Sequence, residues 1–406
     1  MTWRAHMTHR WTRSALLLAG IALVAAALAG TAAARVDANG AAAAKTVNVG
    51  FIYPKTGGLS AFGQEEFDGF NAGLAYVKGK CGGYTINPTF VDDATDPATA
   101  IAAAKNLIGQ GYKILAGTGS SGIAVQLAPL AAQNQVLYIS GAAAADAITG
   151  LNRYTFRAGR QTLQDVLDAA NIFPPKSAGK KVVVFAEDTA FGAGNYAAVS
   201  AIFGSKGHTV SKILVPFGAA DLTPFAQQLK NSGADAVFVA WAGANGPAMW
   251  QALQQQGVPQ KMTIITGLAN RELYDTFGPL VPGVTLLSHY VYQAPHNAVN
   301  TWLIKYMAKQ HQVPNIFTPD GFVTAQMICR AISKGNPTDV NSMISALEGW
   351  QFLAPKGKQY IRPADHAMLQ PMFQVQLLNN GKGHFAVKVI KTISPGNVQP
   401  PVTPFK

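Results

Sequence analysis

Short β-branched runs alternate with alanine-rich helical stretches along most of this chain, and no other feature limits its possible folds as strongly. From Thr46 onward, each strand-like run is followed by a helical stretch and by a turn that contains Gly or Asn. This order is typical of a parallel β-sheet covered by helices, so we predict an α/β protein. The expected strands form two sets, 47–53, 85–91, 113–116, 136–140 and 154–157, then 181–186, 209–216, 234–241, 262–266 and 284–290.

One passage is repeated in pattern, once in each set of strands. Both copies run strand, polar loop, helix, glycine turn, strand, and their helices begin at Asp96-Pro97 and Thr223-Pro224, a capping residue followed by proline. The copies read FVDDATDPATAIAAAKNLIGQGYKILAG and ILVPFGAADLTPFAQQLKNSGADAVFVAW. A chain of this length also exceeds what one hydrophobic core usually serves. We therefore expect two similar lobes.

The N-terminus has the order of a secretory signal peptide. Three arginines among the first 13 residues precede an apolar run at 15–29, and small-residue cleavage sites follow at 27–29 and 32–34. We predict that residues 1–34 are a signal peptide and that the protein is exported. An uncleaved membrane anchor over 14–34 is the alternative.

The net charge and the cysteine content limit which kinds of partner and cofactor the protein could bind. Without the signal peptide, 29 basic and 20 acidic residues remain, a net charge of +9 that favours anionic ligands or an acidic cell surface. Basic runs with interleaved aromatics are absent, so we expect no nucleic-acid partner. Cys81 and Cys329 either form a disulfide in an oxidising compartment or stay buried thiols. No Cys/His cluster has metal-ligand spacing, and we expect neither metal nor cofactor.

The chain changes character beyond Tyr290. Helical stretches are expected at 297–310, 320–334 and 341–350. A hairpin follows, with strands 373–378 and 385–390 around the turn sequence NNGKG. The proline-rich end, residues 393–406, is expected to be a poorly packed tail.

The sequence GTGSSG carries the most suggestive local motif. Gly117, Gly119 and Gly122 have dinucleotide-binding spacing, but they follow the third strand, and no acid ends the next strand to hold a ribose. Two interpretations stay open. Backbone N–H groups with the hydroxyls of Ser120 and Ser121 would bind an anion at the start of a helix. Alternatively, the segment is a tight turn with capping serines.

No catalytic constellation is evident. The eight histidines have no recognisable family context, and the adjacent pair Asp365-His366 does not converge on one point. Glu65 and Glu66 begin a helix, where they complement its dipole rather than act as acid and base. We predict that the protein is not an enzyme.

Several fragments in a fixed order resemble a known family. The chain is similar to the periplasmic leucine/isoleucine/valine-binding type of solute receptor, which has the type I periplasmic binding fold, over nearly all of residues 46–390. The fragments are VGFIYPKTGGLSAFGQEEFDGFNAGLAYV, FVDDATDPATAIAAAKNLI, GTGSSGIAVQLAPLA, YTFRAGRQ, VVVFAEDTAFGAGN and GKQYIRPADHAMLQPMF. The resemblance implies two Rossmann-like α/β lobes, joined by three crossover strands, that close on a ligand.

The resemblance also sets the expected boundaries. The first lobe would comprise 46–158 with 293–351, and the second lobe 159–290 with 356–392. The crossovers are expected near 157–160, 288–292 and 352–355.

The resemblance implies a ligand site at matching positions. A ligand carboxylate would meet Ser121 and Ser120 at the helix start, with the backbone of Ala142 nearby. Phe62 matches the position of an aromatic wall, and Phe191 matches a tyrosine of the opposite lobe. Trp241 lies near another aromatic position. For each of these aromatics, simple core packing is the alternative, and Tyr290 and Tyr292 are further possible walls.

Two departures from the family pattern affect the expected ligand. Ala144 stands where amino-acid binders have a hydroxyl, and Thr266 stands where they have an acid for the ammonium group. A buried ammonium without an anionic partner is unfavourable, so a free α-amino acid is less expected unless Asp146 or Asp188 supplies the charge. Arg160 is either a bidentate partner for an anion or a surface hinge residue. An aromatic or apolar carboxylic acid is the leading ligand.

These observations predict the extracytoplasmic solute-binding component of an ABC importer. Its partners would be a small carboxylated solute, aromatic, aliphatic or amino-acid-like, and a membrane permease. A ligand-sensing ectodomain for a signalling partner is the alternative, and an exported enzyme on the same scaffold is a more remote one.

Overall fold

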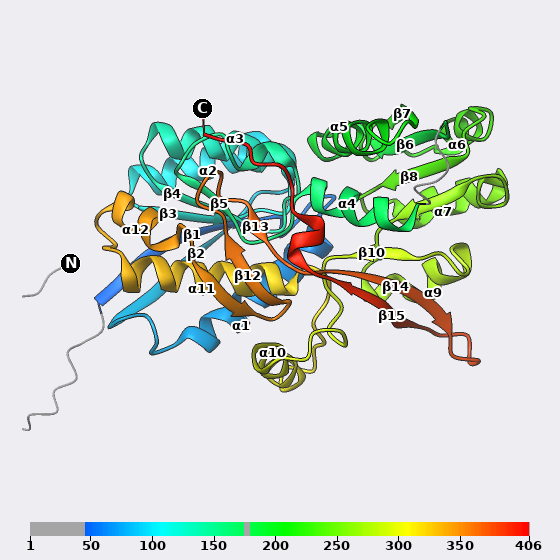
Figure 1. Cartoon of the computed structure of the whole chain (residues 1–406). Helices are drawn as coiled ribbons and strands as arrows, with labels where there is room; N and C mark the ends of the chain where they lie inside the picture. Colours follow the sequence, from blue (N-terminus) through cyan, green and yellow to red (C-terminus); the bar gives the residue numbers. More distant parts are fainter. Residues whose placement is uncertain (1–44, 174–178, 406) are drawn as a thin grey trace, which may run out of the picture. The chain divides into compact units, whose positions relative to one another are not determined.

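The computed structural model of the chain describes residues 45–173 and 179–405, so the predicted signal peptide lies outside the described residues. Its first parallel sheet has the order β2-β1-β3-β4-β5, and all five expected strands are present (Figure 1). They are β1 (Lys45–Tyr53), β2 (Tyr84–Asp92), β3 (Ile114–Gly117), β4 (Leu137–Ser140) and β5 (Thr155–Arg157). The chain is therefore an α/β protein, as predicted.

The second parallel sheet repeats the strand order of the first, β7-β6-β8-β9. Its strands are β6 (Lys181–Glu187), β7 (Thr209–Val215), β8 (Ala236–Ala240) and β9 (Thr263–Thr266). The tenth expected strand, β10 (Leu286–Ser288), touches this sheet through one parallel bridge. It pairs mainly in a separate antiparallel sheet with β14 (Met372–Asn379) and β15 (Phe385–Ile393), the predicted hairpin. Two Rossmann-like lobes result.

Helices of the first lobe pack around a close helix pair. These helices are α1 (Ser60–Val77), α2 (Pro97–Gly109), α3 (Ser121–Gln133), α10 (Ala298–Ala308), α11 (Thr318–Lys334) and α12 (Val340–Leu347). Gly69 of α1 packs directly on the backbone of Thr318 in α11, where a Cβ atom would collide with the carbonyl oxygen. A disulfide links Cys81, in the segment that follows α1, to Cys329 of α11, with Cα atoms 5.0 Å apart. The cysteines are therefore paired, the first of the two alternatives.

Helices of the second lobe cover the β6–β9 sheet. They are α4 (Thr162–Ile172), α5 (Ala190–Gly204), α6 (Thr223–Lys230), α7 (Gly246–Gln255), α8 (Val258–Lys261) and α9 (Tyr274–Phe277). Each repeated passage forms a strand, a helix and a strand. Asp96 caps α2 by accepting from the Thr99 N–H, as expected. In the second copy Thr223 is already helical, and its N–H donates to Asp221 instead.

The third crossover lies later in the chain than the resemblance implied. Three short strands, β11 (Gln351–Ala354), β12 (Gly357–Ile361) and β13 (Met368–Leu369), form an antiparallel sheet. Ala354, Ile361 and Met368 are buried in the same core as the strands of the first lobe. The chain therefore crosses at Gln370-Pro371, just before β14. The expected crossover at 352–355 is wrong, because the apolar faces of β12 and β13 complete the first core.

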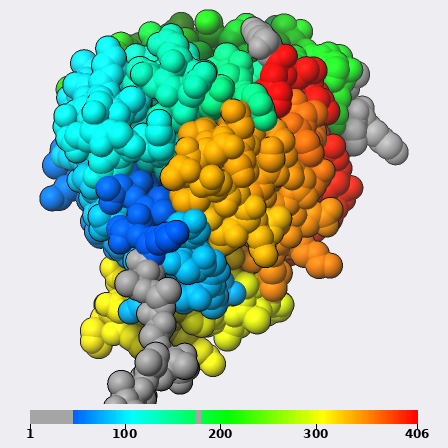
Figure 2. Space-filling model, turned by 90° about the vertical axis from the view of Figure 1, so that its left-hand side faces the viewer, coloured from blue at the N-terminus to red at the C-terminus, as the bar shows by residue number. Residues whose placement is uncertain are grey.

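The expectation of a poorly packed C-terminal tail is also wrong. Val398, in the short 3₁₀ helix η4 (Pro395–Val398), is buried against Met372 and Ile393 of the second lobe. The Arg362 guanidinium of the first lobe then donates to the carbonyl oxygens of Pro400 and Pro401 at 2.8 and 3.1 Å. Figure 2 shows these C-terminal residues lying against the residues that precede β14. The segment therefore contacts both lobes.

The length and hydropathy of the helices show whether the described part of the chain could cross a membrane. Within residues 45–173 and 179–405, none of the helices combines the length and hydropathy needed to cross a bilayer. The predicted anchor over 14–34 lies outside these residues.

Candidate functional site

A cavity of about 930 Å³ lies where strands of both parallel sheets end. In open sheets of this kind, ligands bind in a crevice outside the carboxyl ends of two neighbouring strands. These are the two strands between which the order of the strands in the sheet reverses. β1 and β3 meet this condition in the first lobe, and β6 and β8 in the second. All nine residues predicted to bind the ligand line this cavity: Phe62, Ser120, Ser121, Ala142, Ala144, Arg160, Phe191, Trp241 and Thr266. Their contact with a ligand stays a prediction.

The GTGSSG turn places the start of α3 at the cavity. Gly117 and Thr118 both have positive φ, +97° and +52°, and a Cβ atom at Gly117 would collide with the Ile52 carbonyl oxygen. The turn therefore requires glycine at this position. The Ser120 side chain makes no capping hydrogen bond to α3, which contradicts the capping-serine interpretation for this residue.

Ser121 ties the turn to the loop after β4. Its Oγ accepts hydrogen bonds from the N–H groups of Ala144 and Ala145 at 3.2 and 3.1 Å. A hydroxyl can accept two bonds and still donate its own proton. The Ser121 hydroxyl can therefore donate to an anion in the cavity while it holds the loop in place.

Arg160 is a buried cation in the cavity wall. Its Nε donates to Asp165 Oδ2 at 3.2 Å, and its Nη1 donates to the Ala142 carbonyl oxygen at 3.1 Å. Only 7% of the residue is exposed, so it is not a surface hinge residue. Burial raises the pKa of Asp165, and the charge of Arg160 opposes this shift. Nη2 makes no hydrogen bond to the described residues, and Arg160 lines the cavity, so Nη2 is the nitrogen of this guanidinium that a ligand could use.

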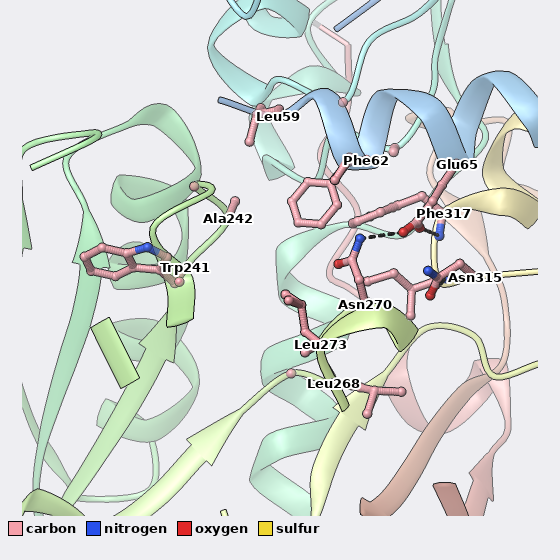
Figure 3. A pocket seen from close by; sticks show the side chains of 18 of the residues that line it. Leu59, Phe62, Glu65, Trp241, Ala242, Leu268, Asn270, Leu273, Asn315 and Phe317 are labelled. Atoms are coloured by element: carbon pink, nitrogen blue, oxygen red, sulfur yellow. Dashed lines mark hydrogen bonds between the residues drawn. The ribbon is translucent and has the colours of Figure 1, made fainter. Parts of the chain in front are cut away.

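Aromatic side chains from both lobes form the walls. Phe62 meets Phe317 edge to face, with ring centroids 4.6 Å apart, and both lie at the cavity (Figure 3). In the second lobe, Trp241 stacks on Phe185 at 5.6 Å, and Phe191, in the first turn of α5, packs partly buried against the core. These residues pack on the core and also line the cavity, and their role as ligand walls stays a prediction.

Tyrosines 290 and 292 do not line the cavity. Tyr290 is fully buried, and its hydroxyl donates to Asn300 Oδ1 at 2.7 Å. Its expected role as a ligand wall is therefore wrong, because the second crossover carries it into the first lobe.

Glu65 and Glu66 are not in the first turn of α1, as the dipole interpretation required; both are buried. Glu65 lines the cavity and accepts from Asn270 Nδ2 at 2.5 Å and from the Phe317 N–H at 3.0 Å. Burial raises the pKa of Glu65 well above its usual value. Glu66 lies behind the cavity against Gly141, where a Cβ atom would collide with its carboxylate.

The candidate counter-ions for an ammonium group, Asp146 and Asp188, do not line the cavity. Asp146 Oδ1 accepts from the Leu163 N–H and from Gln161 Nε2. Glu187 does line the cavity, but its Oε2 accepts from two backbone N–H groups, those of residues 242 and 243. Its Oε1 is buried.

Sequence reasoning missed Asn270, Phe317 and the cavity-facing position of Glu65. Asn270 precedes the short 3₁₀ helix η2 (Arg271–Leu273), Phe317 directly precedes α11, and neither belongs to a motif that the sequence displays. The helical period of α1 could have placed Glu65 on its buried face, since Phe62 and Gly69 lie one turn away on either side.

Comparison with known proteins agrees with this geometry. The sequence model of the periplasmic binding protein family matches residues 46–382. Leu/Ile/Val-binding protein homolog 3 of Brucella melitensis is 26% identical over 309 residues, 75% of this chain and 83% of that protein.

Solved structures share the fold. An ABC-type branched-chain amino acid transporter protein from Rhodopseudomonas palustris has a TM-score of 0.71 at 28% identity, covering 89% of this chain and 100% of that one. A solute-binding protein of R. palustris in complex with 4-hydroxybenzoate has a TM-score of 0.78 at 23% identity, covering 86% and 97%. Proteins of the matched family bind solutes and are not enzymes, and this chain belongs to the periplasmic binding protein family.

Proposed function

We propose that this protein is the extracytoplasmic receptor of an ABC importer and that it binds a small aromatic carboxylate in the cavity between its lobes. One observation supports an aromatic carboxylate as the class of ligand. A buried guanidinium edge of Arg160 and the Ser121 hydroxyl lie in a cavity whose walls include Phe62, Phe317 and Trp241. An anionic group would bind the polar atoms and a flat apolar body would bind the rings.

Two further points support an aromatic acid over a free α-amino acid. Both oxygens of Glu65 and Oε2 of Glu187 already accept hydrogen bonds from the protein, so an ammonium group would gain less from these acids than from free carboxylates. The structural neighbour with 4-hydroxybenzoate shares the fold, although its identity of 23% carries no ligand assignment by itself.

Ligand binding can be measured directly on the purified mature protein. Benzoate and related aromatic carboxylates should raise the melting temperature more than leucine, because a ligand that binds only the native state stabilises it by mass action. The ligand assignment is wrong if leucine, isoleucine or valine gives the largest shift.

The anion site is tested by removing its charge. Arg160→Gln should weaken benzoate binding about 10- to 100-fold, the range expected for a charge-assisted hydrogen bond. Arg153→Gln makes the same charge change at an exposed residue that does not line the cavity, and its affinity should equal that of the wild type. Equal loss in both variants would point to a general effect of net charge.

The importer role requires export and a permease. Cleavage after the predicted signal peptide, 1–34, would show as a shortened N-terminus in protein secreted by the native cell. Reconstituted with its permease and ATPase, the loaded protein should stimulate ATP hydrolysis and solute uptake. Stimulation of a histidine kinase without uptake would support the sensor alternative instead.

A further inference from the structure

The side-chain amide of Asn270 presents an oxygen atom to the cavity. Figure 3 shows Oδ1 pointing into the space beside Phe62 and Leu273, while Nδ2 points away toward Glu65. Oδ1 accepts no hydrogen bond from the residues that the structure describes, whereas Nδ2 donates to Glu65 Oε1 at 2.5 Å.

Glu65 fixes which end of this amide faces the cavity. An amide has one accepting and one donating end, and an ionised carboxylate only accepts. Burial raises the pKa of Glu65, whereas the hydrogen bonds from the Phe317 N–H and from Asn270 favour its ionised form, and the orientation holds while Glu65 is ionised. The Glu65 carboxylate cannot turn away, because its second oxygen accepts from the Phe317 N–H at 3.0 Å. The NH₂ end of Asn270 is therefore held on Glu65, and the oxygen is left for a ligand.

The turn that carries Asn270 is itself anchored to the first lobe. The Arg271 N–H donates to Asn315 Oδ1 at 3.1 Å, and Asn315 Nδ2 donates to Glu272 Oε2 at 2.7 Å. The turn also closes on itself through a hydrogen bond from the Leu273 N–H to the Asn270 carbonyl oxygen. A preorganised acceptor loses little entropy when it binds a donor.

The surroundings of the Asn270 oxygen are apolar. Phe62, Leu268 and Leu273 line the same part of the cavity (Figure 3). In such a site, a ligand acceptor placed against the amide oxygen would leave both atoms unpaired away from water, which is unfavourable. A ligand hydroxyl would satisfy the oxygen.

We infer that Asn270, positioned by Glu65, makes the protein select solutes that carry a hydrogen-bond donor, such as a ring hydroxyl, over the same solutes with hydrogen or an acceptor there. This inference rests on the proposed binding of aromatic carboxylates. It assigns Asn270 as a specificity residue and Glu65 as its positioning residue.

Isothermal titration of the mature protein with a small ligand panel tests the inference. The panel is benzoate, the three monohydroxybenzoates and their methoxy counterparts. The best hydroxybenzoate should bind about tenfold more tightly than benzoate and than its methoxy counterpart. Equal affinities would overturn the selection of a donor and leave the proposed function standing. No binding of any benzoate would overturn both.

Two substitutions identify the residues responsible. Glu65→Gln places an NH₂ group opposite Asn270, so the Asn270 amide should turn and present its own NH₂ to the cavity. The preference should then fall to unity or reverse toward the methoxy compound, which a merely structural role would not produce. Asn270→Ala should bring benzoate, the hydroxybenzoates and the methoxybenzoates to equal affinity, and it serves if Glu65→Gln does not fold. Glu348→Gln, outside the cavity, should keep the wild-type preference. An unchanged preference in Asn270→Ala would overturn the assignment.

Discussion

The raised pKa of Asp168 predicts a pH-dependent contribution to stability that one substitution should remove. The side chain lies in α4 and is fully buried, with Oδ1 accepting from Gln374 Nε2 at 2.7 Å. Its Oδ2 has no hydrogen-bond partner in the described part of the chain. Burial raises the pKa of Asp168 to about 7, although the hydrogen bond from Gln374 opposes the shift.

The sign and size follow from the two pKa values. In the unfolded chain an aspartate titrates near its ordinary value of 3.8, so between that pH and about 7 the folded state binds the extra proton. Stability from the protonated form is therefore complete below about pH 4 and is lost as the pH rises through 7. At about 1.4 kcal/mol per pKa unit, the loss attributable to Asp168 is about 2–3 kcal/mol between pH 5 and pH 8.

Asp168→Asn removes this titration and keeps the Gln374 hydrogen bond. The difference in free energy of unfolding between the variant and the wild type should grow by about 2–3 kcal/mol in the variant's favour from pH 5 to pH 8. Urea unfolding followed by circular dichroism at both pH values measures it, and the other titrating groups cancel in the difference.

Asp235→Asn is a control of opposite sign. The Lys181 N–H and the Lys180 side chain lower the pKa of Asp235, so its charged form is favoured in the folded protein. This variant should therefore lose stability relative to the wild type as the pH rises through the carboxylate range. A difference between Asp168→Asn and the wild type that stays constant with pH would refute the assignment of a raised pKa.

Three other predictions concern contacts that stabilise the fold around the candidate site. Reduction of the Cys81–Cys329 disulfide should lower the free energy of unfolding by about 2–5 kcal/mol, because the bond closes a long loop; unchanged denaturant midpoints would contradict this. Gly141→Ala should reduce the yield of folded protein, since its Cβ atom would meet the Glu66 carboxylate, and a wild-type melting temperature would argue against that contact. Arg362→Met should increase amide exchange in residues 399–405 with little change in the sheets; exchange that stays slow there would show that other contacts hold the segment.

The fold could be predicted because its signals are local. Ten strands and the C-terminal hairpin follow from alternation, turn glycines and helix caps such as Asp96, which act within a few residues. The third crossover could not be placed, since it depends on Ile361 and Met368 packing on strands some 200 residues or more earlier in the chain. The packing of the C-terminal segment depends in the same way on a distant residue, Arg362, and no periodic pattern in the sequence predicts this contact.

The residues of the candidate site also fall into two groups, those that local sequence signals could place and those that depend on distant contacts. Ser121, Ala142 and Trp241 follow the ends of strands, and the strand order of a doubly wound sheet brings such ends to one crevice. Asn270 and Phe317 reach the cavity from irregular segments, and their orientation depends on hydrogen bonds across more than 200 residues. The spacing of residues in the sequence does not predict hydrogen-bond partners that lie so far apart in the chain.

The proposed anion site and the connections between the lobes share residues, which would link ligand binding to closure. Lys356, fully buried, donates to Asp320 at 2.5 Å in the first lobe and to Gln370 at 2.8 Å in the third crossover. Breaking such a buried pair is strongly unfavourable, so we expect the lobes to rotate about this point rather than part there. His289 of the second crossover lies 3.8 Å from the same aspartate. Since Arg160 belongs to the first crossover, a ligand carboxylate bound to its guanidinium would act directly on the segments about which the lobes turn.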